Sequence, residues 1–158
     1  MKIGVLSDTH LKTMSSELGE ILIKHLSGAD IILHAGDVVE TEVLDIFKSQ
    51  ELCLVAGNMD STAIKQNNPW KRVIPLGRFK IGLIHGWGSP AFIEQRIQRE
   101  FEEVDCIVFG HTHNPCNRKI GKTLFFNPGS PTDKRFAKAN SIGILTIENG
   151  LSGEIIYL

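Results

Sequence analysis

The sequence has no apolar stretch that approaches the roughly 18 residues needed to span a membrane. Its first apolar run, residues 3–6, is shorter than the core of a secretory signal peptide and ends in a polar turn. Cysteine is scarce: Cys53, Cys106 and Cys116 are odd in number and lack CxxC spacing, and the first two lie inside apolar runs. These absences argue against a disulfide framework and predict a cytoplasmic protein with reduced thiols and no membrane partner.

An excess of charge of either sign is also missing. The 158 residues include 17 basic and 18 acidic residues, for a formal net charge of -1. Such a balance provides no broad basic face, so long nucleic acid is not an expected partner. The sequence lacks repeats, low-complexity tracts and linkers, and 42% of its residues are hydrophobic. One globular domain over residues 1–158 is therefore expected.

Short apolar runs alternate with amphipathic segments over the first two thirds of the chain. Strands are expected at residues 2–6, 30–34, 52–56, 72–76, 79–84 and 106–109. The last third is rich in strands and turns, and predicts strands at residues 116–120, 123–127, 141–148 and 153–158. A repeated strand–loop–helix order favours a mostly parallel sheet with helices packed on it.

Three helices are expected between these strands. The first follows from apolar residues with helical spacing over positions 18–26. Thr41 is expected to cap a second, short helix. Ser89 and Pro90 are expected to begin a third, whose apolar face extends to Val104. Residues 59–71 are polar and are expected to form a loop with one turn at most.

Metal-binding side chains follow the apolar strands, usually beside a glycine. In chain order they are Asp8, His10, Asp37, Asn58, His85, His111 and His113. In an open α/β sheet, the loops that leave the carboxyl ends of the strands form the ligand crevice. Five loops therefore bring seven potential ligands towards one region of the molecule.

The spacing and chemistry of these residues indicate a metal centre. The two members of each pair, Asp8 with His10 and His111 with His113, project to the same side if the backbone is extended. Carboxylate, imidazole and amide oxygen together suit manganese, iron, zinc, nickel or cobalt better than calcium. Seven ligands exceed what one catalytic ion needs and suit two ions about 3.5–4 Å apart that share a carboxylate.

Each of these features has an ordinary structural explanation when it stands alone. Gly-Asp and Gly-Asn pairs are usually turn residues, and an Asp-x-His sequence after a strand is often incidental. The joint pattern, in order and at each strand end, is what makes a site the better interpretation. His25 lies on a helical pattern and is expected to be a surface residue. His34 precedes the Gly36-Asp37 turn and is expected either to support a metal ligand or to be a packed residue, rather than to bind a metal itself.

The series Ser7-Asp8-Thr9-His10, Gly36-Asp37, Gly57-Asn58, His85-Gly86 and Gly110-His111-Thr112-His113 resembles the calcineurin-like metallophosphoesterase superfamily. The small size and Asn127-Pro128-Gly129-Ser130 resemble its compact YfcE-type phosphodiesterase branch, to which the phosphoesterase-fold subunit of retromer also belongs. The resemblance covers essentially the whole chain. It implies a four-layer αββα fold, with two mixed sheets flanked by helices.

The resemblance also implies a ligand assignment. One metal is held by Asp8, His10, Asp37 and His113, and the other by Asp37, Asn58, His85 and His111, so that Asp37 bridges. Among these, Asp37, His85 and His111 are the expected catalytic residues. The implied cofactors are two divalent ions, with manganese expected and nickel, iron, zinc or cobalt as alternatives. A hydroxide that bridges the ions is then expected to attack the phosphorus of a small phosphate diester.

Two positions depart from the family pattern. Met59 stands where many members have a histidine after the Gly-Asn pair, and Trp87 stands where close relatives read His-Gly-His. Neither side chain can donate a proton, so a preference for esters with good leaving groups is expected. Asp60 is expected either to orient a ligand histidine or to be a turn residue, and Asn127 to close the Pro128-Gly129 turn or contact substrate.

Three functions stay open from the sequence. The first is hydrolysis of a phosphodiester, and the second is hydrolysis of a phosphomonoester or nucleotide by the same metals. The third is a binding scaffold like the retromer subunit, although no ligand is missing here. Family habit suggests a homodimer or larger homo-oligomer. Residues 59–71, with Trp70, are the candidate for a local lid over the site.

Overall fold

The computed structural model describes all 158 residues, which form two mixed five-stranded sheets. The first sheet has the order β10-β9-β1-β2-β3, with bounds Leu151–Tyr157, Ser141–Ile147, Lys2–Leu6, Ile31–His34 and Leu52–Leu54. Strands β1, β2 and β3 run parallel, and β9 and β10 add antiparallel strands at one edge. The second sheet has the order β4-β5-β6-β8-β7, with bounds Lys71–Leu76, Phe79–Ile84, Cys106–Val108, Thr123–Asn127 and Cys116–Ile120.

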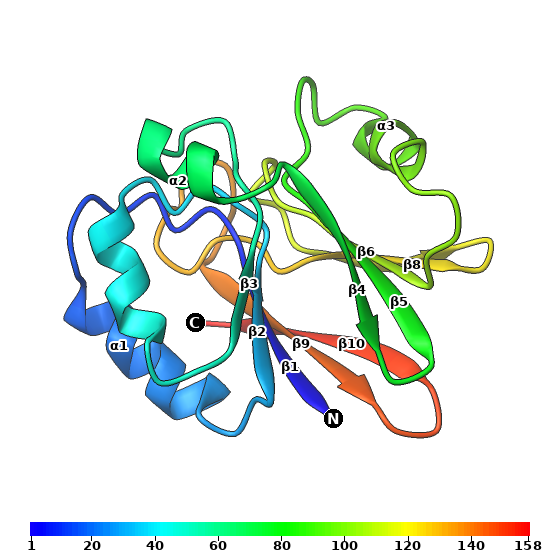
Figure 1. Cartoon of the computed structure of the whole chain (residues 1–158), viewed down its shortest axis with the longest axis horizontal. Helices are drawn as coiled ribbons and strands as arrows, with labels where there is room; N and C mark the ends of the chain where they lie inside the picture. The colour runs from blue at the N-terminus through cyan, green and yellow to red at the C-terminus, as the bar shows by residue number, and fades with distance from the viewer.

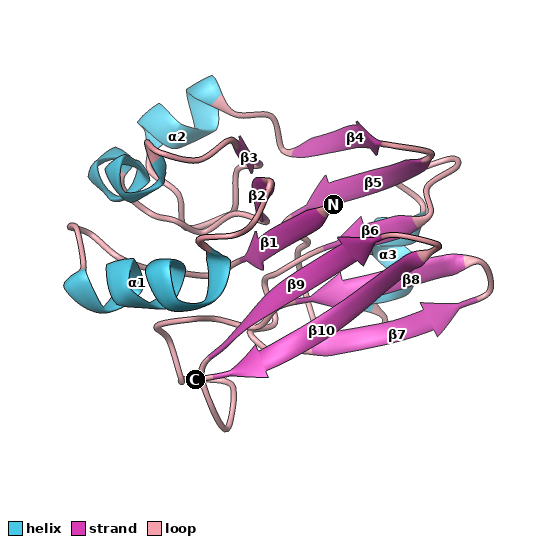
Figure 2. Ribbon diagram, turned by 90° about the horizontal axis from the view of Figure 1, so that it is seen from below, coloured by secondary structure: helices cyan, strands magenta, loops and turns pink.

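Helices cover the outer face of each sheet. Figure 1 shows α1 (Ser16–Ile21) and α2 (Thr62–Asn67) on the side of β2 and β3, whereas α3 (Ile93–Gln98) lies on the opposite side of the molecule. A π-helical turn, η1 (Leu22–Leu26), continues α1, and a 3₁₀ helix, η2 (Thr41–Phe47), joins β2 to β3. The two sheets lie between these helices, as the view in Figure 2 shows. The expected four-layer αββα fold is therefore confirmed.

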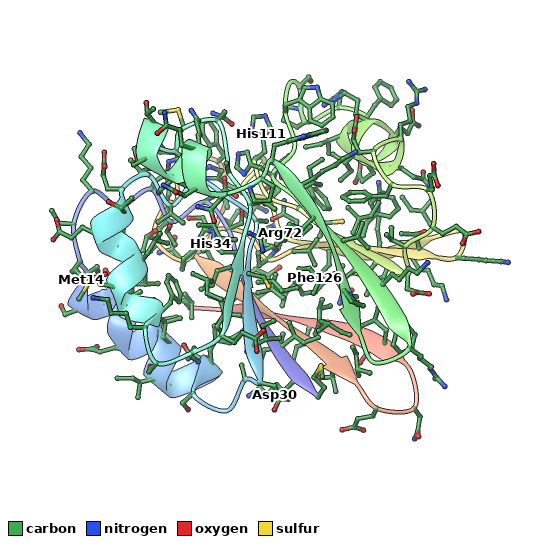
Figure 3. The ribbon with its side chains drawn as sticks, viewed as in Figure 1. Met14, Asp30, His34, Arg72, His111 and Phe126 are labelled. Carbon is green, nitrogen blue, oxygen red and sulfur yellow. The ribbon has the colours of Figure 1, made fainter.

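Three apolar cores separate the four layers, because alternate residues of a strand face opposite sides of its sheet. Between the sheets, Ile3 and Val5 of β1 pack with residues such as Leu83 and Phe126 of the second sheet, and Phe126 is labelled there in Figure 3. Leu6 belongs instead to the core under α1, η1, η2 and α2. The third core lies under α3 and contains Ile93, Ile97, Phe101 and Phe109 among others.

The expected strands are confirmed, with small differences at their ends, but the helix starts need correction. Thr41 does not cap its helix: Glu40 occupies that position, and no side chain bonds to the first turn. The third helix begins at Ile93 and ends at Gln98, so Ser89 and Pro90 do not begin it. The Ala91 amide donates to Ser89 Oγ in a local turn, and Phe92, which adopts a left-handed conformation, separates this turn from the helix. The interval 59–71 contains α2 rather than an isolated turn. None of the helices is both long and apolar enough to traverse a membrane.

Candidate metal centre

All seven predicted ligand side chains lie at one end of the two sheets. Four of them follow strands of the first sheet: Asp8 and His10 after β1, Asp37 after β2, and Asn58 after β3. The other three follow strands of the second sheet: His85 after β5, and His111 and His113 after β6. Figure 3 shows His111 at this rim of the molecule, with His34 deeper inside. The structure thus brings the side chains that follow the strands together, as the strand-end rule predicts; their role as metal ligands stays a prediction.

A first group of potential ligands is formed by Asp8, His10 and His113. The Nε2 atoms of the two histidines are 3.2 Å apart, and Nε2 of His113 lies 3.4 Å from Asp8 Oδ1. Nε2 of His10 is 3.9 Å from the same oxygen and 3.6 Å from Asp37 Oδ2. The two imidazole rings are stacked, with centroids 5.0 Å apart.

A second group lies beside the first and contains Asp8, Asp37 and His85. Nε2 of His85 is 3.3 Å from Asp37 Oδ2 and 4.0 Å from Asp8 Oδ1. Asn58 Oδ1 is 3.1 Å from His85 Nε2 and 3.1 Å from His111 Nδ1, which brings the last two ligands to this side. Both carboxylates thus lie between the groups; the assignment of Asp37 as the bridging ligand stays a prediction.

Each carboxylate has one oxygen held by the protein and the other turned towards the histidines. Oδ2 of Asp8 accepts hydrogen bonds from Ser7 Oγ (2.6 Å) and from the His111 amide (3.0 Å). Oδ1 of Asp37 accepts one from the Met59 amide (2.7 Å). Because these donors fix the side-chain orientation, Oδ2 of Asp37 and Oδ1 of Asp8, which accepts only a longer bond from the His111 amide (3.2 Å), are preorganised to bind a cation.

The histidines are oriented in the same way by backbone carbonyls. Nδ1–H of His85 donates to Ala35 O (2.8 Å), and Nε2–H of His111 donates to Gly88 O (2.8 Å). In the neutral ring, which is the metal-binding form, the opposite nitrogen presents a lone pair towards Asn58 Oδ1, which is itself an acceptor. Acceptors that face each other at about 3 Å need a proton or a cation between them, and this donor set of imidazole nitrogen and amide oxygen fits divalent metal ions.

The backbone of the site departs from the expectation made from sequence. Left-handed φ angles occur at five of the seven ligands, namely Asp8 (55°), His10 (47°), Asp37 (58°), His111 (68°) and His113 (56°). The Asp8 and His10 pair, like the His111 and His113 pair, therefore reaches the site without an extended backbone, so the expectation of an extended backbone was wrong. Such conformations are costly for non-glycine residues and cluster at functional sites. Hydrogen bonds from the Asp8 amide to Gly36 O (3.0 Å) and from the His10 amide to Asp37 O (3.0 Å) hold them.

Asp60 acts on the loops and not on a histidine. Its carboxylate accepts hydrogen bonds from three amides, those of Asp37 (3.1 Å), Val39 (2.7 Å) and Gly57 (2.7 Å), and it contacts no imidazole. The expectation that it orients a ligand histidine is wrong. A buried carboxylate that satisfies three buried N–H groups instead ties the loop after β2 to the loop after β3. Asp60 thereby positions Asp37 through its backbone.

The other two supporting candidates also have structural roles. Asn127 accepts from the Gly129 amide (2.9 Å), which closes the expected turn, and its Nδ2 donates to Gly110 O (3.0 Å) beside His111. His34 is fully buried, accepts from the Gly36 amide (3.2 Å) and does not reach the metal groups. Its interpretation as a packed residue is confirmed.

Sequence reasoning missed a segment that follows the Pro128-Gly129 turn. Asp133 Oδ2 lies 3.6 Å from His113 Nδ1, and Arg135 pairs with the Asp133 carboxylate. Arg135 and Phe136 line an open depression of about 510 Å³, together with Met59 and several of the metal ligands. Neither a strand end nor a glycine motif marks this segment, and only the return of the chain past Asp8, through a hydrogen bond from Ser130 Oγ to Asp8 O (2.7 Å), places it there.

Burial and neighbouring carboxylates shift the pKa values of several side chains at the site. Burial raises the pKa of the Asp8 carboxyl to about 7. Burial alone would lower the pKa of His85, but the carboxylates of Asp37 and Asp8 raise it to about 8. Burial also lowers the pKa of both His10 and His113, which favours their neutral, metal-binding form.

Known proteins resemble this chain over nearly its full length. Residues 1–150 match the family model for the calcineurin-like phosphoesterase superfamily domain. The protein named Probable metallophosphoesterase from Methanocaldococcus jannaschii is 36% identical over 99% of this chain and 81% of its own length. The protein of the same name from Methanothermobacter thermautotrophicus is 34% identical over 99% of this chain and 92% of its own length.

Solved structures share the fold. The predicted phosphoesterase of Streptococcus pneumoniae superposes with a TM-score of 0.78 and is 26% identical over 99% of this chain and 88% of its own. A novel archaeal phosphodiesterase gives a TM-score of 0.73 at 24% identity, with all of both chains covered. Vps29 of Entamoeba histolytica in complex with Zn²⁺ gives 0.72 at 25% identity, with 99% of each chain covered. The chain belongs to the calcineurin-like phosphoesterase superfamily.

Proposed function

We propose that this protein is a dinuclear metal-dependent phosphodiesterase that acts on a small phosphate diester. The observation that carries the proposal is the convergence of seven ligand side chains into two adjoining groups, with two carboxylates between them. Divalent cations bound there supply a nucleophile from water near neutral pH and neutralise charge on the phosphoryl oxygens. Asp8, His10, Asp37 and His113 would hold one ion, and Asp37, Asn58, His85 and His111 the other.

Two depressions beside the centre support a diester over a monoester. One, of about 510 Å³, is bordered by Met59, Arg135 and Phe136, and the other, of about 310 Å³, by Trp70 and Trp87. Both include Asn58, so they adjoin at the ligand set. A phosphorus atom at the metals would thus have room for an organic group on either side, as a diester requires.

Arg135 is the candidate phosphate-binding side chain of the larger depression. It is the only lysine or arginine among the residues that border this depression. Guanidinium groups bind phosphoryl oxygens through paired N–H donors. Its present bond to Asp133 keeps the side chain close to His113 and to the reaction centre.

The leaving group should matter strongly in this enzyme. Met59 borders the larger depression and Trp87 the smaller one, and neither side chain carries a proton to give to a departing alkoxide. Rates on a series of aryl methyl phosphodiesters should therefore fall steeply as the pKa of the leaving phenol rises. Rates that are independent of this pKa, with the chemical step shown to limit turnover, would contradict the expectation.

Turnover of bis-p-nitrophenyl phosphate and of p-nitrophenyl phosphate with added Mn²⁺ tests the proposal. The diester should be hydrolysed faster than the monoester, and Asp37→Ala should abolish both reactions. Asp45→Ala is the matched control, because Asp45 pairs with Lys48 on the surface of η2 and does not belong to the site. Faster monoester turnover would indicate a phosphomonoesterase.

A binding scaffold is the second candidate, supported by the shared fold with Vps29. The complete ligand set weighs against it, because a scaffold does not need preorganised open ligands. Absence of turnover by the wild type with Mn²⁺, Ni²⁺, Fe²⁺, Zn²⁺ and Co²⁺ would favour the scaffold.

A further inference from the structure

The chain has only two tryptophans, and they lie together beside the metal centre. The rings of Trp70 and Trp87 meet edge to face, with centroids 6.3 Å apart and an angle of 68° between the planes. Their side chains are 52% and 40% exposed, which is unusual for a pair of such large apolar groups in contact. Both border the depression of about 310 Å³ that also includes Asn58 and His85.

Backbone hydrogen bonds place Trp70 and Trp87 beside the candidate ligands. Trp87 precedes Gly88, whose carbonyl oxygen accepts the Nε2–H of His111 (2.8 Å), and its own carbonyl accepts from Arg96 (3.0 Å). Trp70 follows Pro69, whose carbonyl accepts from the Ala56 amide (2.9 Å) two residues before Asn58. The backbone beside the pair is therefore hydrogen-bonded to the same loops that carry the candidate metal ligands.

A charged contact further fixes one ring. The Lys71 ammonium lies 4.8 Å from the Trp70 ring centroid, and Glu100 holds it at 3.0 Å through a carboxylate oxygen and at 2.8 Å through its carbonyl. Exposed indole rings held this way lose little conformational freedom when a flat ligand stacks on them. A depression of this volume lies at the lower end of the range for small-molecule pockets.

We propose that Trp70 and Trp87 form a stacking subsite for a planar aromatic ring, a nucleobase or an aryl group, carried by one ester group of the substrate. The inference rests on the proposed function, because the metals place the phosphorus next to Asn58 and His85. Indole rings stack on any flat π-system and bind it without hydrogen bonds. This mode of binding suits the depression of about 310 Å³, whose lining has few polar side chains. This subsite would make the enzyme selective for aromatic or nucleotide esters over aliphatic ones.

Tryptophan fluorescence tests the subsite without catalysis. Because both tryptophans lie in it, excitation at the red edge of the indole band reports its occupancy. Adenosine 5′-monophosphate and phenyl phosphate should quench the tryptophan fluorescence of the Zn²⁺-loaded protein, and ribose 5-phosphate should not.

Quenching by adenosine 5′-monophosphate but not by phenyl phosphate would identify the ring that binds as a nucleobase, and quenching by both would show that the subsite accepts any aryl ring. Trp70→Phe and Trp87→Phe leave a single reporter each and should both retain the response. Equal responses to adenosine 5′-monophosphate and ribose 5-phosphate would overturn the subsite.

Inhibition of bis-p-nitrophenyl phosphate turnover provides the second arm. Adenosine 5′-monophosphate should inhibit about tenfold more tightly than ribose 5-phosphate, since stacking on an aromatic side chain typically contributes that much. The double variant Trp70→Leu with Trp87→Leu should reduce this ratio to about one, whereas Tyr157→Leu, an exposed aromatic on β10, should keep it. If the wild type hydrolyses the diester but the two phosphates inhibit it equally, the stacking subsite is wrong and the phosphodiesterase proposal still holds. If adenosine 5′-monophosphate quenches the fluorescence but the protein hydrolyses no diester, the subsite holds and the proposed phosphodiesterase activity is wrong.

Discussion

Two side chains of the candidate metal centre hold protons that a cation must displace. Burial raises the pKa of the Asp8 carboxyl to about 7, and the neighbouring carboxylates raise the pKa of His85 to about 8, so both groups bind protons near neutral pH in the metal-free protein. Metal ligands must be deprotonated. We therefore expect metal binding at pH 7 to release roughly one to two protons, and metal affinity to rise with pH through the interval between 6 and 8.

Calorimetric titration with Zn²⁺ in buffers of different ionisation enthalpy measures this release. His85→Gln should remove the share of the release that comes from His85, because glutamine has no titrating proton, and should leave the share from Asp8. Identical apparent enthalpies in all buffers would show that the site is already deprotonated when the metal arrives.

His34 makes a second, independent contribution to pH dependence. Burial lowers its pKa to about 4, and its Nδ1 already accepts the Gly36 amide proton, so the folded protein does not readily bind a proton there. The unfolded chain binds one at about pH 6.5. Between pH 6.5 and 4 the unfolded state thus holds more protons, and the free energy of unfolding falls as the pH falls.

His34→Gln should remove this contribution, about 1.4 kcal/mol per pH unit within that window. It should also lower the free energy of unfolding at pH 7 by about 1–3 kcal/mol through the altered hydrogen bonds. Urea unfolding across the pH range, without metal, measures both effects. Thr9→Val, which removes the Thr9 hydroxyl 3.4 Å from His34 Nε2 but no titrating group, should keep the acid dependence. An unchanged slope in His34→Gln would assign the acid loss to other residues.

The convergence of the candidate ligands could be predicted from sequence, but their local geometry could not. A metal-binding side chain at the carboxyl end of a strand points to a site because parallel strands share an edge. The left-handed conformation of Asp8 or His111, in contrast, depends on hydrogen bonds from loops far away in the chain, such as the Asp8 amide to Gly36 O. Arg135 could not be found because no local pattern distinguishes it from a surface arginine.

At the scale of elements, the loops after β2 and β3 are packed too closely to tolerate a larger residue between them. A Cβ atom added at Gly57 would lie 2.2 Å from Asp37 Oδ1 and 2.5 Å from the Asp37 amide nitrogen. The Asp37 backbone cannot retreat, because Asp60 binds both the Asp37 and the Gly57 amides.

Gly57→Ala should therefore displace Asp37 and lower kcat/KM for bis-p-nitrophenyl phosphate by about a hundredfold, the usual effect of a 1 Å misplacement. Gly28→Ala is the matched control, since a Cβ there meets nothing within 4 Å, and it should retain wild-type activity. Zinc binding measured on the same variants tells whether the loss is in metal affinity. Full activity in Gly57→Ala would mean that the loop adapts and that Asp37 has no fixed position.

The same contrast between local and distant causes holds for the elements. The strands could be predicted because a short apolar run bounded by glycine or aspartate is typical of a buried strand. Both β1 and β5 have the expected bounds. Helical periodicity could not distinguish α-helix from the π-helical turn η1 or the 3₁₀ helix η2, since each keeps its apolar residues on the sheet. Strands β9 and β1 are far apart in the sequence, and their pairing depends on the whole fold. No local sequence pattern therefore predicts that they are neighbours in the sheet.

At the scale of the whole molecule, the metal centre connects the two sheets. Asp8, His10, Asp37 and Asn58 come from loops of the first sheet, and His85, His111 and His113 from loops of the second. Elsewhere the sheets meet mainly through apolar contacts such as those of Phe126. Cations that bind both sets of ligands bind the folded state and not the unfolded chain, so they should stabilise the protein by mass action.

The melting temperature should accordingly rise with the logarithm of free Zn²⁺ concentration. At 100 times the dissociation constant the gain should be about 2.7 kcal/mol for one ion, and a chelator should reverse it. Asp37→Ala, which removes a carboxylate oxygen 3.6 Å from His10 Nε2 and 3.3 Å from His85 Nε2, should lose most of this gain, while Asp45→Ala should keep it. A wild type that binds zinc by calorimetry but melts at the same temperature with and without it would mean that the unfolded chain binds zinc as tightly as the folded protein, and would contradict a centre that only the folded state assembles.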